Sequence, residues 1–121
     1  MLKLNHKNLD VWKLSIAFTT KIYDMTNNFP NSEMYGLSSQ LRRAAVSVSS
    51  NIAEGAARKS KLERIRFFEI ARSSIVEIDT QLEISTRLNF VKHDRLDEID
   101  KDMNRIFAML SKLIKSTSTL E

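Results

Sequence analysis

The chain has 121 residues with a formal net charge of +4, no cysteine, two glycines and one proline. The lack of cysteine excludes disulfides and thiolate metal sites and favours a cytoplasmic location. So few glycines and prolines disfavour β-sandwiches and barrels, which need many tight turns. The apolar runs are too short to span a membrane or to form the core of a signal peptide. We therefore expect one all-α domain over residues 1–121.

Apolar residues recur at spacings of three and four, which predicts helices over residues 8–28, 33–57, 61–88 and 94–115. The fourth of these is the most clearly amphipathic. Short connections make successive helices antiparallel neighbours, so the predicted architecture is an up-down-up-down four-helix bundle. The predicted core residues are Val11, Leu14, Phe18, Ile22, Met25, Phe29, Leu37, Leu41, Ala44, Val48, Ile52, Ile65, Phe68, Ile75, Ile78, Leu82, Leu96, Ile99, Met103, Ile106, Leu110 and Leu113, with Trp12, Ile16 and Tyr23 widening the face of the first helix.

Local signals predict where the helices begin and end. Pro30 restricts the backbone of Phe29 and should end the first helix. A helix start is predicted where a side-chain oxygen can cap the free amides of the first turn. A helix end is predicted at a residue that tolerates left-handed backbone angles. These signals are Asn31 or Ser32 for the second helix, the Ser60–Glu63 capping box for the third, Asn89 as the stop of the third, and Asp94 for the fourth.

This topology would bring three basic segments to one end of the bundle. Residues 1–18, 50–66 and 105–121 carry net charges of +2, +3 and +2, so this end carries +7 and the remainder −3. A basic end attracts phosphate backbones with a salt-dependent affinity, although a solvated surface is the alternative interpretation. The candidate nucleic-acid contacts are Arg58, Lys59, Lys61 and Arg64, supported by Lys3, Lys7, Lys112 and Lys115.

A second face of the second helix carries mostly small side chains, which let another helix approach closely. Successive residues of a helix are about 100° apart, which places these residues on one face. The face is either a contact inside the bundle or an interface between subunits. Its members are Ser39, Val46, Ala53 and Ala57, with Arg42 and Ser49 beside them.

Polar residues follow a third line of the second helix. Arg43, Asn51 and Glu54 lie on or beside it, and Arg72 and Glu77 of the third helix could supply partners. If Glu54 is buried it should be paired, because an isolated buried charge is very costly. A structural ion pair is the first interpretation, and a catalytic carboxylate is the alternative, which lacks a companion base.

Motifs for chemistry are missing from the sequence. His6 and His93 have no ligand-like neighbours, and Gly36 and Gly55 are isolated, so neither a zinc site nor a phosphate-binding glycine loop is expected. No serine has a histidine nearby for activation. We expect no catalytic residue, no cofactor and no metal, and hence no enzyme.

The segment YGLSSQLRRAAVSVSSNIAEGAAR at residues 35–58 resembles the hallmark of the four-helix-bundle family encoded in intervening sequences of bacterial 23S rRNA genes. The flanking segments LDVWKLS (9–15), FPNSEMYGL (29–37) and RFFEIARSSIVEIDTQLEIS (66–85) match in order and spacing. The resemblance covers nearly the whole chain and implies the same fold.

The resemblance also implies partners. The family includes the accessory variability determinants of diversity-generating retroelements, which are homopentamers with a basic surface that binds nucleic acid, and which associate with a reverse transcriptase. By this resemblance the chain would be a homopentamer that binds RNA or DNA, with a reverse transcriptase as partner if a retroelement encodes it. The small face of the second helix would then be a candidate subunit interface.

One position departs from the family pattern. Many members carry proline where Ser49 stands here. Since proline in a helix interior removes a hydrogen bond and bends the helix, we expect a straighter second helix in this chain.

Two functional hypotheses follow from the sequence. The first is a non-enzymatic, homo-oligomeric scaffold whose basic end binds nucleic acid. The second is a protein-interaction module that docks a partner through helical surfaces and has no nucleic-acid role. Salt-dependent binding of RNA or DNA would favour the first, and a protein partner that survives nuclease treatment the second.

Overall fold

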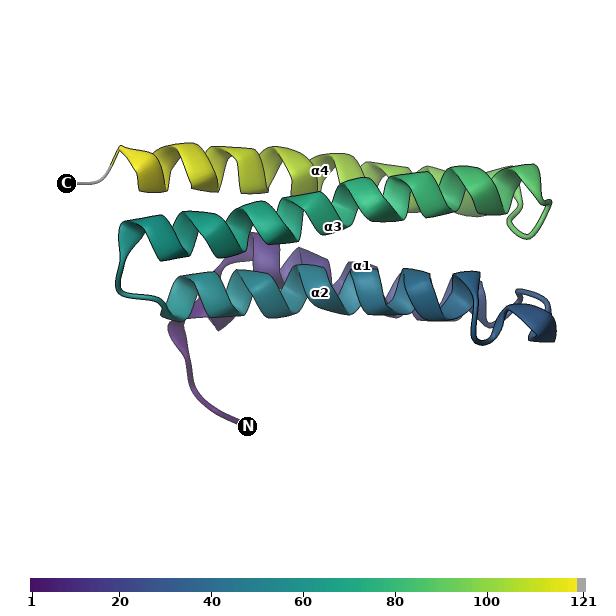
Figure 1. The fold of residues 1–121 in the computed structure, drawn as a ribbon, viewed down its shortest axis with the longest axis horizontal. Coiled ribbons are helices and arrows are strands. Elements are labelled where there is room, and N and C mark those ends of the chain that lie inside the picture. Colours follow the sequence, from purple (N-terminus) through teal and green to yellow (C-terminus); the bar gives the residue numbers. More distant parts are fainter. Residues whose placement is uncertain (120–121) are drawn as a thin grey trace.

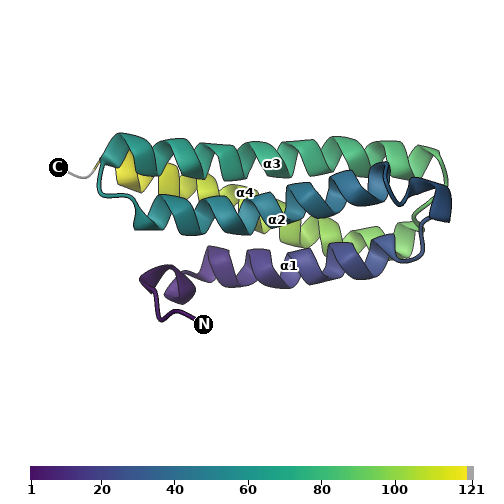
Figure 2. The ribbon, with the colours of Figure 1, turned by 60° about the horizontal axis from the view of Figure 1, so that its bottom comes forward.

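The computed structural model describes residues 1–119, and every regular element in them is helical. Four α-helices run alternately up and down as an antiparallel bundle (Figures 1 and 2), which confirms the predicted fold. They are α1 (Asp10–Thr26), α2 (Leu37–Ala57), α3 (Lys61–Arg87) and α4 (His93–Ser118). Two 3₁₀ turns, η1 (Asn5–Asn8) and η2 (Asn31–Glu33), precede α1 and α2.

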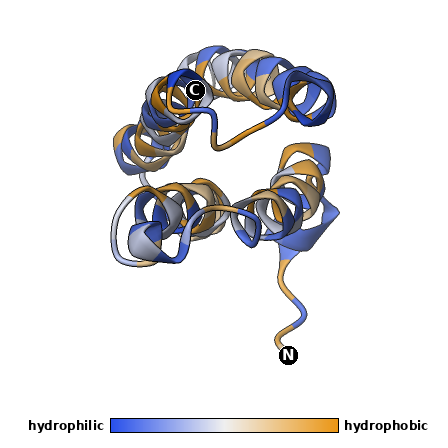
Figure 3. Cartoon of the chain, turned by 90° about the vertical axis from the view of Figure 1, so that its right-hand side faces the viewer, coloured by the Kyte–Doolittle hydropathy of each residue, from blue (hydrophilic) through white to orange (hydrophobic). Residues whose placement is uncertain are grey.

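The core lies between the four helices, along the predicted stripes except at Ile16 and Tyr23, which are exposed, and at Ile65, which is half-buried outside the core cluster. Viewed along the bundle, apolar residues lie on the inner sides of the helices and polar residues on the outer sides (Figure 3). Phe18, Leu41, Ile78 and Ile106 have no exposed surface. Leu14, Leu37, Leu96 and Leu113 pack on the edge of this core and are half-buried. Burial of this apolar surface is the main force that holds the helices together.

Two predicted boundary signals are confirmed. The side-chain Oγ of Ser60 accepts a hydrogen bond of 3.1 Å from the backbone amide of Glu63 and caps α3. At the other end of α3, Asn89 has a φ of 61°, in the left-handed region where asparagine is tolerated.

The predicted start of α2 is wrong by four residues. Neither Asn31 nor Ser32 caps the helix, because this segment forms η2, which has no side-chain cap. The helix begins at Leu37, whose amide donates a 3.1 Å hydrogen bond to the Oε1 of Glu33. The carboxylate of Glu33, in the preceding turn, therefore accepts the bond that a capping serine or asparagine was expected to accept.

The predicted ends of α1 and α4 also need correction. The first helix ends at Thr26, before the Phe29-Pro30 pair, and Phe29 turns back into the core. The fourth begins at His93 with Lys92 at the cap position, so Asp94 lies in the first turn and is not the cap. It continues to Ser118, where the buried side chain of Thr117 holds the last turn against the bundle.

Small side chains bring α2 and α3 close together. The hydroxyls of Ser47 and Ser74 are 3.0 Å apart across this contact. A Cβ on Gly55 would lie 2.6 Å from Cε1 of Phe68 and 3.1 Å from the backbone oxygen of Arg64. Glycine is therefore required at position 55 because the third helix passes too close for a side chain.

The second helix is uninterrupted from Leu37 to Ala57 and passes through Ser49 without a break in its helical assignment. The hydroxyl of Ser49 lies 2.9 Å from that of Ser15 on α1. Ser49 thus joins two helices by a hydrogen bond at the position where a proline would remove one.

Ion pairs join α1 to α4 at the end away from the chain's N-terminus. The Nζ of Lys21 lies 2.7 Å from the Oδ2 of Asp102 and 2.7 Å from the Oε1 of Glu98. Arg95 forms an ion pair with Asp24. The two carboxylates raise the pKa of Lys21, with the hydrogen bond to Asp102 as the largest cause. The same contact with Lys21 lowers the pKa of Glu98.

Candidate nucleic-acid interface at the basic end

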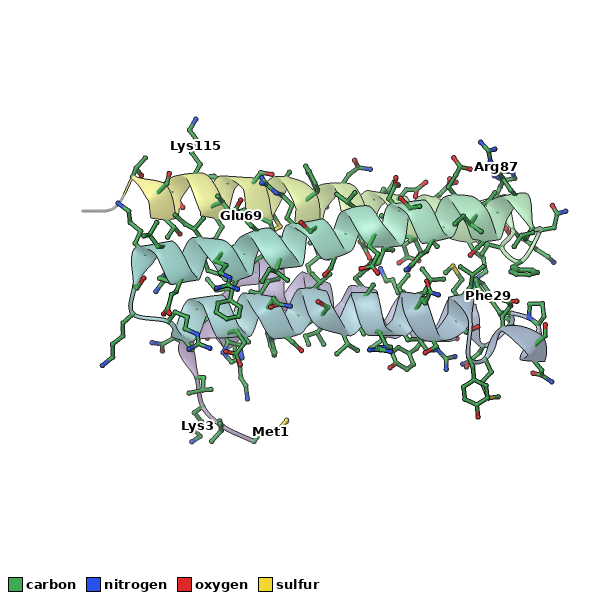
Figure 4. All side chains as sticks on the ribbon, viewed as in Figure 1. Met1, Lys3, Phe29, Glu69, Arg87 and Lys115 are labelled. Atoms are coloured by element: carbon green, nitrogen blue, oxygen red, sulfur yellow. The ribbon has the colours of Figure 1, made fainter. Side chains whose placement is uncertain are left out.

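The antiparallel topology places the start of α1, the end of α2, the start of α3 and the end of α4 at one end of the bundle (Figure 1). Lys3 and Lys115 both lie towards this end, whereas Phe29 and Arg87 lie at the other (Figure 4). The segments that carry the +7 charge are therefore brought together, and we call them the basic end. The opposite end contains the second half of α3 and the first half of α4, which both carry a net negative charge.

Arg58, at the turn between α2 and α3, is held by two neighbours. Its Nη2 lies 3.0 Å from the Oε2 of Glu54, and its guanidinium lies 4.8 Å from the centroid of the Phe67 ring. The ion pair is exposed, so its contribution to stability is small. Glu54 and Phe67 thus hold the guanidinium against the outer side of α2 and α3.

The remaining cations of this end differ in exposure. Lys59, Lys61, Lys112 and Lys115 are exposed, which suits contact with a phosphate backbone. Arg64 is half-buried, and its Nε is buried without a hydrogen-bond partner in residues 1–119. Arg64 therefore also packs against the helices and is a poorer candidate than the four lysines.

Lys3 belongs to the arm that precedes η1 and leaves the bundle, whereas Lys7 lies in η1, which contacts α1 and α2 (Figure 4). Lys7 donates a hydrogen bond to the backbone oxygen of Leu2. Lys3 is exposed. Lys3 lies at the same end of the bundle as Lys115 but on the opposite side of it (Figure 4).

The small face of α2 divides into two parts. Arg42 and Ser49 are used inside the bundle, because Arg42 donates to Thr26 and Asn27 and Ser49 contacts Ser15. Arg42 also lies 4.8 Å above the Tyr23 ring. The other four, Ser39, Val46, Ala53 and Ala57, stay half-buried or exposed, with Val46 43% exposed. The predicted internal contact applies to the first part, and the second part is open to a neighbour.

The five predicted polar-network residues do not form one network in residues 1–119. Asn51 donates to the backbone and hydroxyl oxygens of Ser47. Arg72 donates to Ser111 on α4, and the side chain of Gln81 donates to Glu77. Arg43 and Glu77 line the same surface hollow between α2 and α3, and Glu54 is exposed beside Arg58.

The exposure of Glu54 removes the reason to expect a buried ion pair there. Its partner lies four residues along the same helix, at Arg58. This i, i+4 spacing is visible in the sequence and is the signal that identifies Arg58 as the partner of Glu54.

Neither a metal site nor a membrane span is found in residues 1–119. No group of three or more histidine, aspartate or glutamate side chains is placed to hold a metal ion. No helix there has both the length and the apolar composition needed to cross a bilayer.

Comparison with known proteins gives the family. The family model described as 23S rRNA-intervening sequence protein matches residues 7–112. A crystal structure of a protein of unknown function from the S23 ribosomal protein family of Bacteroides thetaiotaomicron is similar, with a TM-score of 0.78 and 25% identity over 87% of this chain and 98% of that one. No curated protein matches. The extent of the family match shows that this chain belongs to the 23S rRNA-intervening sequence protein family.

Proposed function

We propose that this chain is a cytoplasmic, non-enzymatic, homo-oligomeric scaffold whose basic end binds RNA or DNA. The observation that carries the proposal is the convergence of three basic segments, with a combined charge of +7, at one end of the bundle. Four exposed lysines there, Lys59, Lys61, Lys112 and Lys115, supply the phosphate contacts. Contact with phosphates gives affinity without sequence preference.

Oligomer formation would strengthen the electrostatic attraction. The open part of the small face of α2, with Val46 at its centre, offers a helix surface that a second copy can approach. In a pentamer of parallel bundles, which the family resemblance implies, five basic ends would form one ring. Such a ring would bind a polyanion by many weak contacts at once.

Fluorescence anisotropy with labelled mixed-sequence RNA and DNA oligonucleotides tests the nucleic-acid role. The triple variant Lys59→Glu, Lys112→Glu, Lys115→Glu should weaken binding and flatten the salt dependence, because each lost phosphate contact lowers the slope by about 0.7 to 0.9. The matched control is Arg87→Glu, Lys92→Glu, Lys101→Glu, which changes the net charge equally outside the basic end. Absence of binding at low salt, or equal weakening by the control, would refute the proposal.

A further inference from the structure

A groove with apolar walls lies between α3 and α4, in the half of the bundle away from the basic end. It is lined by Ile75, Val76 and Asp79 of α3 and by Asp100, Met103, Asn104 and Phe107 of α4, and its volume is about 220 Å³. Val76 is 53% exposed and Phe107 41% exposed. The volume is below the roughly 300 Å³ at which small-molecule pockets begin, so it suits one or two inserted side chains.

Carboxylates gather at one end of this groove. Asp79 and Asp100 face it from opposite helices, and Asp97 lies one turn before Asp100. None of the three forms an ion pair in the described part of the chain. Burial, together with the charges of Asp79 and Asp97, raises the pKa of Asp100. A cation placed here would relieve this repulsion.

The arm that precedes η1 has the complementary composition. Leu2 is 71% exposed and Leu4 46% exposed, and Lys3 lies between them. Leu4 has extended backbone angles, so the chain enters η1 from an extended conformation. The base of the arm is fixed, because the His6 ring packs edge-on against Trp12 with centroids 5.0 Å apart.

The arm lies on the opposite side of the bundle from the groove of its own chain. It leaves the bundle on the side of α1 and α2, away from α3 and α4 (Figures 1 and 3). Only the groove of another molecule is therefore accessible to it. The arm is short enough to fit, since Leu2 and Leu4 are at most about 7 Å apart, and the seven helical steps from Asp100 to Phe107 rise about 10 Å along α4.

We propose that the arm of one copy binds in the α3–α4 groove of a second copy. Leu2 and Leu4 pack on Val76 and Phe107, and the ammonium group of Lys3 lies between the carboxylates of Asp79 and Asp100. This contact deepens the homo-oligomeric part of the proposed function and rests on it. Because arm and groove are different surfaces, the contact is heterologous, and repeated copies close into a ring if the rotation between them allows.

Cysteine cross-linking tests the contact directly, since the chain has no cysteine of its own. Leu4→Cys and Val76→Cys variants are prepared separately, mixed and oxidised. A disulfide-linked heterodimer should form at least about fivefold more than with Ile84→Cys as partner, because cysteines whose Cα atoms are more than about 7 Å apart are not bridged. Ile84 is a matched control on α3, with 44% exposure, outside the groove lining.

Charge reversal provides a second test with full-length protein. Lys3→Glu and Asp100→Lys should each lower the mean molar mass measured by light scattering, and the double variant should restore it. Asp94→Lys is the control, since it changes the same charge on α4 outside the groove.

The outcomes separate this proposal from the broader one. If wild type stays oligomeric while cross-linking at Val76 is no greater than at Ile84, the arm–groove contact is wrong and the oligomer is held by another surface. Failure of the double variant to restore the mass also refutes the contact. If wild type is monomeric at all concentrations, the homo-oligomeric proposal fails together with it.

Discussion

The α2–α3 and α1–α4 contacts hold the same bundle together in different ways. Between α2 and α3, a glycine and two serines let the backbones approach until Phe68 fills the space over Gly55. Between α1 and α4, Lys21 and Arg95 bridge the helices with ion pairs at the edge of the core. Close packing tolerates almost no added volume, whereas long charged side chains adapt. The two contacts should therefore respond differently to substitution.

The largest effect is expected from Gly55→Val. The added atoms would meet the fully buried Phe68 ring and the backbone oxygen of Arg64, so the helices must separate. We expect the free energy of unfolding, measured by urea denaturation, to fall by about 3 kcal/mol. Ala108→Val, on an exposed site of α4, should cost less than about 1 kcal/mol, which is the helix-propensity difference. Equal effects of the two variants would show that the approach at Gly55 is not tight.

A smaller effect is expected from Lys21→Met. The Asp102 side chain is 10% exposed and would lose the cation that bonds it at 2.7 Å. Leaving this carboxylate without its partner should cost about 1 to 2 kcal/mol in thermal or urea unfolding. Arg87→Met is the control, because its partner Glu83 is exposed and the loss of such a pair costs little. A cost no greater than that of the control would mean that the α1–α4 ion pairs do not stabilise the bundle.

The same ion pairs predict a pH dependence. The pKa of Glu98 is lowered from 4.5, so its contribution to the free energy of unfolding is present above pH 4.5. This contribution is lost as the pH falls through the pKa of Glu98 in the folded state. The pKa of Lys21 is raised from 10.5, so its contribution is present below pH 10.5 and is lost as pH rises through its folded-state value. The stability difference between wild type and Lys21→Met should therefore be largest between these limits. A difference that stays constant from pH 3 to pH 7 would contradict the assignment.

The smallest effect concerns the α3–α4 contact, where like charges meet. The pKa of Asp100 is raised above 3.8, so the folded state holds this proton more tightly than the unfolded chain. Ionisation of Asp100 at neutral pH is therefore unfavourable to folding of a single subunit. In the Lys3→Glu background, where the arm brings no cation to the groove, Asp100→Asn should stabilise the protein by about 0.3 kcal/mol. The gain should disappear below pH 3.8. Urea denaturation of both proteins at neutral pH and again below pH 3.8 measures this change. Asp94→Asn, outside the groove, should give no such gain.

The fold could be predicted from the sequence because it depends on repeated, local signals. The apolar stripes, the Ser60 cap and the left-handed Asn89 each act within a few residues, and the structure confirms them. The start of α2 could not be found this way, because the carboxylate of Glu33, and not the preferred cap residues Asn31 or Ser32, accepts the bond from the amide of Leu37. Cap preference alone does not say which side chain reaches the free amide.

The candidate site was predictable in part. Convergence of the basic segments follows from topology and charge, so it could be inferred without coordinates. Other features depend on how each helix is rotated about its axis, to within a fraction of a turn. They are the burial of Arg64 Nε, the contacts of Arg42 and Ser49 inside the bundle, and the exposure of Glu54. Periodicity averages over a whole helix and does not fix that rotation for a single polar residue. The α3–α4 groove was missed for the same reason.

The order of helix contacts bears on how the chain folds. Each helix packs on the next along the chain, and the α1–α4 contact joins the two most distant helices. Contacts between neighbours in sequence need small loops to close, so they cost little chain entropy and form early. We expect folding on the microsecond-to-millisecond scale typical of helical bundles, with helical hairpins forming first and the Lys21 cross-link closing last.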